Sequence, residues 1–449
     1  MTRETWKTRF GFVMAAAGWS IGLGNIWRFP YVTGKYGGGA FVLLYLVCLF
    51  IIGIPLFIIE FTLGRESQSS ITTGFKKLSP KKPWFIGGWF AMIAVILIFT
   101  YYTMLMGWVA AYLFKSVRAQ YLNMSADQIR TMYNNFTTNS VEVILWQIGC
   151  LIILGFIVSR GLVKGVENFS KVTMPILFLL LMVLGIYSLT LPGAFKGVEF
   201  YLKPDLNKIS FEALLIALGQ VFFSIGVGYG ASWVYGSYLN KNADVPGDAT
   251  RIALMDTVGA LIAGFVIFPA AFAFGINPGS GYDLIFVTLP NVFGRMPGGF
   301  VFGILFFFLI TVAAYTSAIA NLECISSFLM DELKWDRVRS RTKAVWISIV
   351  GIFTLGVPGI LSLGPWKEIR VNNQNIFGFI DSFATNVFLI LAGLSLALFV
   401  GWHLGVKKFM HMANQGAKSI RVKPYWGLLI KYIIPLIIII LFITNLIGG

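Results

Sequence analysis

The sequence predicts an all-α membrane protein with 11 transmembrane helices, built as a 5+5 inverted repeat in which helices 1 and 6 are discontinuous. Three observations lead to this prediction. Hydrophobic residues make up 57% of the 449 residues and charged residues only 12%, whereas soluble domains carry about 25% charge. Apolar segments of membrane-spanning length recur along the chain. Two of these segments carry the same glycine-rich interruption.

Eleven segments reach the roughly 20 apolar residues that a spanning helix requires. They lie at residues 10–30, 40–62, 85–113, 142–158, 172–191, 212–238, 252–275, 300–329, 343–361, 377–401 and 425–447. We therefore expect a multi-pass protein of the plasma membrane, or of the inner membrane in a bacterium, with the lipid bilayer as its surroundings.

Lysine and arginine gather in alternate loops, which predicts the orientation because cytoplasmic loops are enriched in both. With a cytoplasmic N-terminus, the inner loops hold Arg65, Lys76, Lys77, Lys81 and Lys82; Arg160, Lys164 and Lys171; Lys334, Arg337, Arg339, Arg341 and Lys343; and Lys407, Lys408, Lys418, Arg421 and Lys423. An odd number of spans then places the C-terminus outside the cell. This pattern accounts for the net charge of +16, so no nucleic-acid partner is expected.

The glycine-rich interruption occurs in the first and the sixth segment. Ser20–Asn25 reads SIGLGN, and Ser224–Tyr229 repeats it as SIGVGY. Residues 1–191 would form the first repeat (helices 1–5), residues 192–410 the second (helices 6–10), and residues 411–449 an additional C-terminal helix 11. Five spans per half force opposite orientations, so the repeat is inverted.

An unwound helix in mid-membrane frees backbone groups that lipid cannot satisfy, so such a break persists only where it lines a polar cavity. Freed carbonyls suit a hard cation such as sodium, and the positive end of a half-helix suits a carboxylate. The alternative is that the glycines only permit close helix packing. Two interruptions at matching repeat positions favour the cavity.

Six motifs extend the pattern along the chain. They are GLGNIWRFPY (22–31), YGGGAF (36–41), GIPLFIIEFTLGR (53–65), GQVFFSIGVGYG (219–230), GSYL (236–239) and TSAIANLE (316–323). Together they resemble the neurotransmitter:sodium symporter family, which includes bacterial amino-acid transporters of the leucine-transporter type. The resemblance runs from Arg3 to about helix 10. It implies a sodium-coupled secondary transporter that imports an amino acid by alternating access.

The resemblance implies two sodium sites. One would use oxygens of Ser20, Asn25, Ser224 and Asp256, completed by the substrate carboxylate. The other would use Gly18, Ile21, Ala313, Thr316 and Ser317. Hard oxygen ligands suit an alkali cation, although threonine and serine in an apolar helix often bond back to their own helix.

Asp256 departs from the family pattern. Many relatives carry asparagine there and, one turn later, a hydroxyl residue that helps hold chloride; leucine-transporter types carry glutamate at that later position, which here is Ala260. Because residues four apart share a helix face, the carboxylate at 256 would supply the missing charge, which predicts no chloride requirement. A further hypothesis is that Asp256 takes up a proton on the return step. The alternative is a structural pairing with a neighbour.

The resemblance also implies a neutral α-amino acid as substrate. Relatives that carry monoamines have aspartate where this chain has Gly22, and glycine leaves room for the substrate carboxylate, to which the Tyr102 hydroxyl would donate. Phe223 would close over the site as its outer lid. The residues expected to bind substrate are Ser20, Gly22, Gly24, Ile98, Tyr102, Phe223, Ser224, Gly226, Tyr229, Ser317 and Asn321.

Two residues bear on the substrate side chain. Gly226 replaces a bulkier residue of some relatives, which favours a large hydrophobic or aromatic side chain. Asn321 would bond to a polar side chain or an indole N–H, or would face another helix instead.

Two ion pairs are implied as gates that break and reform. Arg28 would pair with Asp381 on the outer side. Arg3 would pair with Asp331 on the inner side, with Trp6, Ser237 and Tyr238 nearby. The alternative is that Asp331 is an ordinary charged residue at the cytoplasmic end of its helix, where such residues are common.

Other function classes fit less well. An enzyme is not expected, because the two histidines, His403 and His411, lie near the inner end of helix 10 without partners for catalysis. A channel would show charge rings or a carbonyl filter. A sodium-coupled carrier of a non-α amino acid or osmolyte remains the alternative. Two loops, Tyr121–Ser140 and Asn277–Gly299, could cap an outer site.

Overall fold

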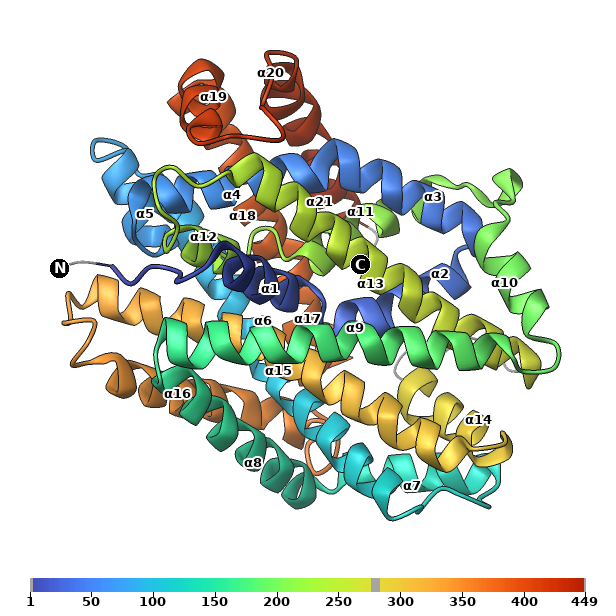
Figure 1. Ribbon diagram of the computed structural model, residues 1–449. Helices are drawn as coiled ribbons and strands as arrows, with labels where there is room; N and C mark the ends of the chain where they lie inside the picture. The colour runs from blue at the N-terminus through green and yellow to red at the C-terminus, as the bar shows by residue number, and fades with distance from the viewer. Residues whose placement is uncertain (1–2, 276–282, 448–449) are drawn as a thin grey trace.

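The computed structural model describes residues 3–275 and 283–447, and they fold into a bundle of long helices (Figure 1). Residues 277–282 of the predicted capping loop lie outside this range. The chain begins at one end of the bundle, beside α5, whereas α10 and α14 lie at the opposite end. We call these the Arg3 end and the α14 end.

The first half of the chain begins with two helices that are joined at a bend. Its helices are α1 (Arg9–Ser20), α2 (Phe29–Lys35), α3 (Gly39–Cys48), α4 (Ile54–Ser67), α5 (Ile71–Leu78), α6 (Phe85–Val117), α7 (Ala126–Thr138), α8 (Ser140–Ser159) and α9 (Asn168–Leu189). Short π-helical turns at Gly24–Arg28, Leu49–Gly53 and Leu162–Glu167 continue into α2, α4 and α9.

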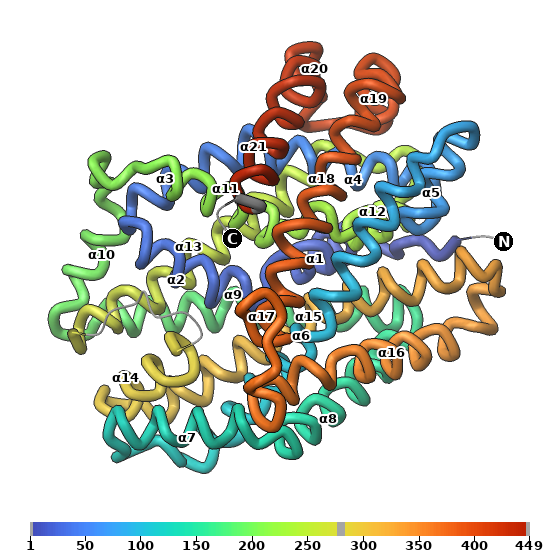
Figure 2. The backbone as a smooth tube through the Cα atoms, turned by 180° about the vertical axis from the view of Figure 1, so that it is seen from behind, coloured from blue at the N-terminus to red at the C-terminus, as the bar shows by residue number. Residues whose placement is uncertain are grey.

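The second half also contains an interrupted helix, formed by α11 and α12, and its last helices lie at one side of the bundle (Figure 2). Its helices are α10 (Ala194–Leu202), α11 (Phe211–Ile225), α12 (Ala231–Gly236), α13 (Val245–Ala273), α14 (Leu289–Arg295), α15 (Gly299–Glu332), α16 (Arg341–Leu361), α17 (Ile376–Phe383), α18 (Leu389–Leu398), α19 (Val406–Asn414), α20 (Trp426–Leu428) and α21 (Ile434–Ile447). One antiparallel pair of strands, β1 (Arg370–Val371) and β2 (Gln374–Asn375), precedes α17.

The predicted spans are confirmed. Among the described residues, nine helical runs are long and apolar enough to cross a membrane, and α1 with α2 makes a tenth, bent by 50°. The predicted segment at 212–238 is divided into α11 and α12, each too short to span alone. Helices 1 and 6 are therefore both discontinuous, as the repeated motif predicts.

The fifth span starts ten residues earlier than predicted, at Leu162 rather than 172. Charged residues conceal this start in the sequence, because Lys171 and Glu167 lower its apolar character. In the structure the two side chains form an ion pair at 2.5 Å. The Glu167 carboxylate also accepts a hydrogen bond from the Thr8 hydroxyl at 2.8 Å, so its charge is compensated within the bundle.

Helix 6 breaks where three glycines adopt a left-handed backbone. Gly226, Gly228 and Gly230 have φ of +68°, +87° and +76°, values that L side chains rarely adopt. These three glycines therefore allow the backbone to leave the helical conformation between α11 and α12.

The helices form a buried centre and a ring around it. In the most apolar stretch of α6, 78% of the residues are buried. In the most apolar stretch of the last span, Trp426–Asn445, only 28% are buried. Figure 2 shows α18 and α21 side by side at the outside of the bundle. Helix 1 packs against α9, α13 and α15, and helix 6 packs against α3, α4, α13 and α15, so both unwound segments are surrounded by other helices.

Candidate functional site

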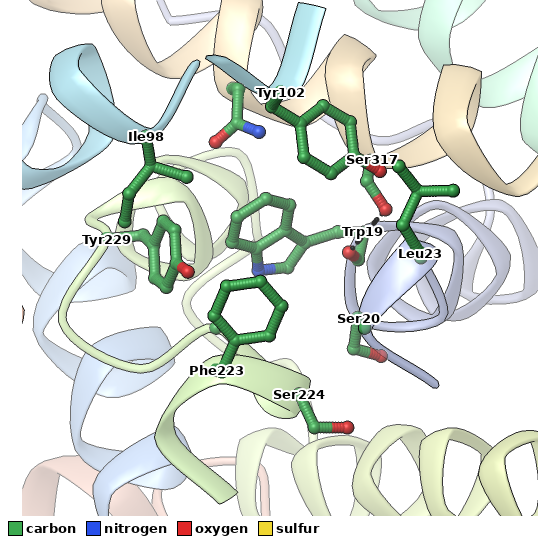
Figure 3. Close-up of a pocket in the computed structure, with 13 residues that line it drawn as sticks. Trp19, Ser20, Leu23, Ile98, Tyr102, Phe223, Ser224, Tyr229 and Ser317 are labelled. Atoms are coloured by element: carbon green, nitrogen blue, oxygen red, sulfur yellow. Dashed lines mark hydrogen bonds between the residues drawn. The ribbon is translucent and has the colours of Figure 1, made fainter. Parts of the chain in front are cut away.

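A cavity lies where the bend of helix 1, the break of helix 6, α6 and α15 come together (Figure 3). All eleven residues predicted to bind substrate line it, together with Trp19 and Leu23, which were not predicted. The structure therefore gathers side chains that lie up to about 300 residues apart in the sequence around one space.

Helix 1 supplies the tightest part of this cavity. A Cβ atom at Gly22 would lie 2.4 Å from the Ser317 hydroxyl oxygen and 3.2 Å from the Tyr102 hydroxyl oxygen, so only glycine fits. The Tyr102 hydroxyl is buried; the Ser317 hydroxyl and the Leu23 backbone N–H approach its oxygen, but it donates to no acceptor among the described residues. Because an unpaired buried donor is costly, it is available to an acceptor brought by a ligand.

A second unpaired polar group lies elsewhere in the cavity wall. Asn321 is 2% exposed, and within residues 3–275 and 283–447 its side-chain oxygen Oδ1 accepts no hydrogen bond. Asn321 therefore faces the cavity, as one of its two predicted roles requires, and can accept a hydrogen bond from a ligand.

The predicted first sodium site surrounds the Asp256 carboxylate, which is completely buried. The Asn25 amide donates to Asp256 Oδ1 at 2.8 Å, and the Ser224 hydroxyl donates to Oδ2 at 2.8 Å. The Asn25 oxygen Oδ1 has no donor in the described part of the chain. Ser20 lines the adjoining cavity. A buried carboxylate beside a free amide oxygen is a donor set that fits a hard cation.

The predicted second sodium site lies where α1 packs on α15. Its residues are Gly18, Ile21, Ala313, Thr316 and Ser317. The Ser317 hydroxyl donates to the carbonyls of Trp19 and Gly18 at 3.0 and 3.3 Å. The Thr316 hydroxyl donates to the Ala313 carbonyl at 2.9 Å, and a Cβ at Gly18 would lie 3.0 Å from Thr316 Cβ. Four of the five residues thus meet; Ile21 is the C-cap of α1, and the ligand expected from it is its backbone carbonyl.

The predicted outer ion pair is not formed in this conformation. Arg28 and Asp381 line the same small cavity, of about 50 Å³, next to the substrate cavity. In the part of the chain that the structure describes they make no direct ion pair, and the Arg28 guanidinium stacks 4.5 Å above the Phe223 ring instead. Phe223 also packs on Gly24 and separates the two cavities, the position expected of a lid.

The predicted inner ion pair is present. Arg3 Nη1 lies 3.2 Å from Asp331 Oδ2, and the guanidinium stacks 4.7 Å above the Tyr238 ring. Burial lowers the pKa of Arg3, and Tyr238 and Asp331 oppose this shift. The Trp6 indole donates to the Tyr235 carbonyl at 3.0 Å. These contacts close the Arg3 end.

Replacing Arg3 with alanine is expected to open the Arg3 end. A part-buried hydrogen bond to a charged group contributes about 1.5–3 kcal/mol, so the open-to-closed ratio should rise ~10–150-fold. The rate at which a maleimide labels Ser237→Cys measures this. Arg337→Ala is the matched control, since Arg337 also contacts Asp331 but belongs to another segment. Equal labelling of the Arg3→Ala protein and its parent would contradict the expectation.

Four residues of the site were missed, and Leu23 in the cavity wall is one of them. Tyr45 donates to Asp256 Oδ2 at 3.4 Å. The buried Glu60 accepts from the Gly228 backbone N–H at 2.9 Å and so ties α4 to the unwound segment. Trp19 enters the substrate cavity from α1. An isolated glutamate in an apolar segment is itself a signal of function, and Trp19 stands out in the small-residue run AAAGWS.

Comparisons with known proteins agree with this geometry. The family model described as the sodium:neurotransmitter symporter family matches residues 3–142 and 119–448. An uncharacterized sodium-dependent transporter of Bacillus subtilis, YhdH, is 37% identical over 444 residues, 99% of this chain and 97% of its own. One of Haemophilus influenzae is 36% identical, covering 99% and 98%.

A solved structure extends the agreement to the fold. The crystal structure of MhsT in complex with L-phenylalanine matches with a TM-score of 0.90 at 39% identity, over 99% of this chain and 100% of that one. The predicted membrane fold with its inverted repeat and the resemblance drawn from the motifs are therefore both confirmed. The chain belongs to the sodium:neurotransmitter symporter family and is a sodium-dependent symporter.

Proposed function

We propose that this symporter imports a neutral, hydrophobic L-α-amino acid by alternating access, coupled to two sodium ions and without chloride. The observation that carries the proposal is the Tyr102 hydroxyl, which donates to no acceptor among the described residues and faces the space that Gly22 leaves open. A carboxylate in that space would accept from Tyr102 and lie near the oxygens of Asn25 and Asp256. Sodium bound there would join the substrate to the protein.

The walls of the cavity support a hydrophobic side chain. Ile98, Tyr229 and Phe223 surround its apolar part, and no charged side chain lines it among the described residues. The MhsT relative was crystallised with L-phenylalanine, which agrees with a neutral hydrophobic amino acid as the class of ligand.

The two gates support alternating access. The Arg3–Asp331 ion pair is formed, whereas Arg28 and Asp381 line a small cavity without forming an ion pair among the described residues. One gate is therefore paired and the other is not in the same structure. In this cycle Arg3 lies on the cytoplasmic side and the α14 end faces outward, an orientation that the basic loops favour.

Asp256 supports chloride independence. Its carboxylate accepts from Ser224 and Tyr45, so the proposed first sodium site contains an acidic group that can supply the negative charge. Ala260, one turn later, is buried and offers no hydroxyl to an anion.

Uptake by the purified protein in proteoliposomes tests the proposal. A mixture of labelled amino acids would be supplied while sodium, chloride and pH gradients are changed one at a time. We expect a neutral α-amino acid to accumulate only with an inward sodium gradient, and equally well when gluconate replaces chloride. Faster uptake with an acidic interior would support proton uptake by Asp256 on the return step. Accumulation of only β-amino acids or osmolytes would contradict the substrate class.

A further inference from the structure

We propose that Trp19 limits the size of the substrate, so that the protein selects neutral amino acids with small side chains, such as alanine. The indole occupies the part of the cavity into which a substrate side chain would extend. This inference rests on the proposed function, because it concerns the same cavity.

The position of the indole is fixed by two contacts, one with Ser232 and one with Tyr229. Trp19 lies in the last turn of α1 and is 5% exposed. Its Nε1 lies 3.2 Å from the Ser232 hydroxyl oxygen on α12, and its ring meets the Tyr229 ring edge-on, with centroids 5.2 Å apart. In Figure 3 the indole lies between Tyr229, Phe223 and Tyr102, in the middle of the cavity. Helices 1 and 6 therefore hold it jointly.

The indole also occupies the space next to Gly226 that was expected to be open to the substrate. Gly226 predicts a large compartment because it replaces a bulkier residue of some relatives. A Cβ atom at Gly226 would lie 2.4 Å from the Cζ2 atom of Trp19. The missing side chain of helix 6 is thus replaced in space by a side chain of helix 1.

The remaining space is small. The cavity measures about 30 Å³, whereas one water molecule requires ~10–15 Å³ by the same measure. Modest movements of the lid can admit a methyl-sized side chain. An aromatic side chain would require the indole to leave, which breaks its contacts with Ser232 and Tyr229 and unpairs a buried polar group.

The test is sodium-dependent binding of labelled L-alanine to the purified full-length protein, with unlabelled glycine, alanine, leucine, phenylalanine and tryptophan as competitors. For the wild type we expect alanine to compete at least tenfold better than phenylalanine. Trp19→Ala should improve competition by phenylalanine at least tenfold. Ser232→Ala keeps the indole but removes its hydrogen bond, and it should improve competition by phenylalanine by a few-fold.

Two controls address stability and chemistry. Trp89→Ala removes an indole from α6 at a site 40% exposed and outside the cavity, and it should keep the wild-type order of competitors. Trp19→Phe leaves a smaller ring in place and should give intermediate values even if Trp19→Ala does not fold.

The outcomes separate this inference from the proposed function. Wild-type protein that binds phenylalanine or tryptophan as tightly as alanine would overturn the role of Trp19, and so would an unchanged order in folded Trp19→Ala and Trp19→Phe. Both results would leave the amino-acid symporter intact. Sodium-independent binding, or no binding of any of the five amino acids, would instead overturn the proposed function together with this inference.

Discussion

Gly22→Ala is expected to weaken sodium-dependent substrate binding by ~5–150-fold. The added Cβ would lie 2.4 Å from the Ser317 hydroxyl oxygen and 3.2 Å from the Tyr102 hydroxyl oxygen, where the substrate carboxylate is proposed to bind. Overpacking of a filled interior costs about 1–3 kcal/mol, and each 1.4 kcal/mol changes a binding constant tenfold. Equilibrium binding of the labelled amino acid measures the effect.

Gly219→Ala provides the matched control for this experiment. Gly219 lies in α11, and a Cβ at this position would meet nothing within 4 Å. The control adds the same methyl group to another helix of the bundle, so it should bind substrate as the wild type does. Unimpaired binding by Gly22→Ala would show that the carboxylate lies elsewhere.

Asp256→Asn is expected to raise the sodium concentration needed for half-maximal substrate binding by a hundredfold or more. The carboxylate is fully buried, and it accepts hydrogen bonds from Asn25 and Ser224 at 2.8 Å. Removing one partner of a buried charge pair costs about 3–5 kcal/mol, which corresponds to ~150–4,000-fold in affinity. Chloride should partly restore binding, because an anion can then replace the lost charge.

Asp248→Asn is the control for this second substitution. Asp248 is buried on the same helix, α13, but its carboxylate is paired with Arg9 at 2.7 Å, outside the proposed ion site. Its sodium response should match the wild type. A normal sodium response of Asp256→Asn, unaffected by chloride, would contradict both the ion site and the chloride prediction.

The break positions could be predicted because they depend on local chemistry, whereas the residues of the cavity were predicted from the resemblance to the family. Glycine at 226, 228 and 230 permits the left-handed backbone, and the repeated motif marks both interruptions. The contribution of Trp19 could not be predicted, because the direction of its indole depends on Ser232, 213 residues away. The unformed Arg28–Asp381 pair is likewise a property of one conformation, which a sequence does not specify.

The short helix α1 has a mechanical consequence. Its 12 residues make a rod about 18 Å long, which leads from the N-terminal segment with Arg3 to the carbonyl of Gly18 beside Ser317. A rigid rod cannot tilt at one end without displacing the other. If a cation binds at the Gly18 carbonyl, as proposed, its release and the opening of the Arg3 end would be thermodynamically linked, and each would shift the other by the same free energy. The sodium gradient would then bias the direction in which the protein opens.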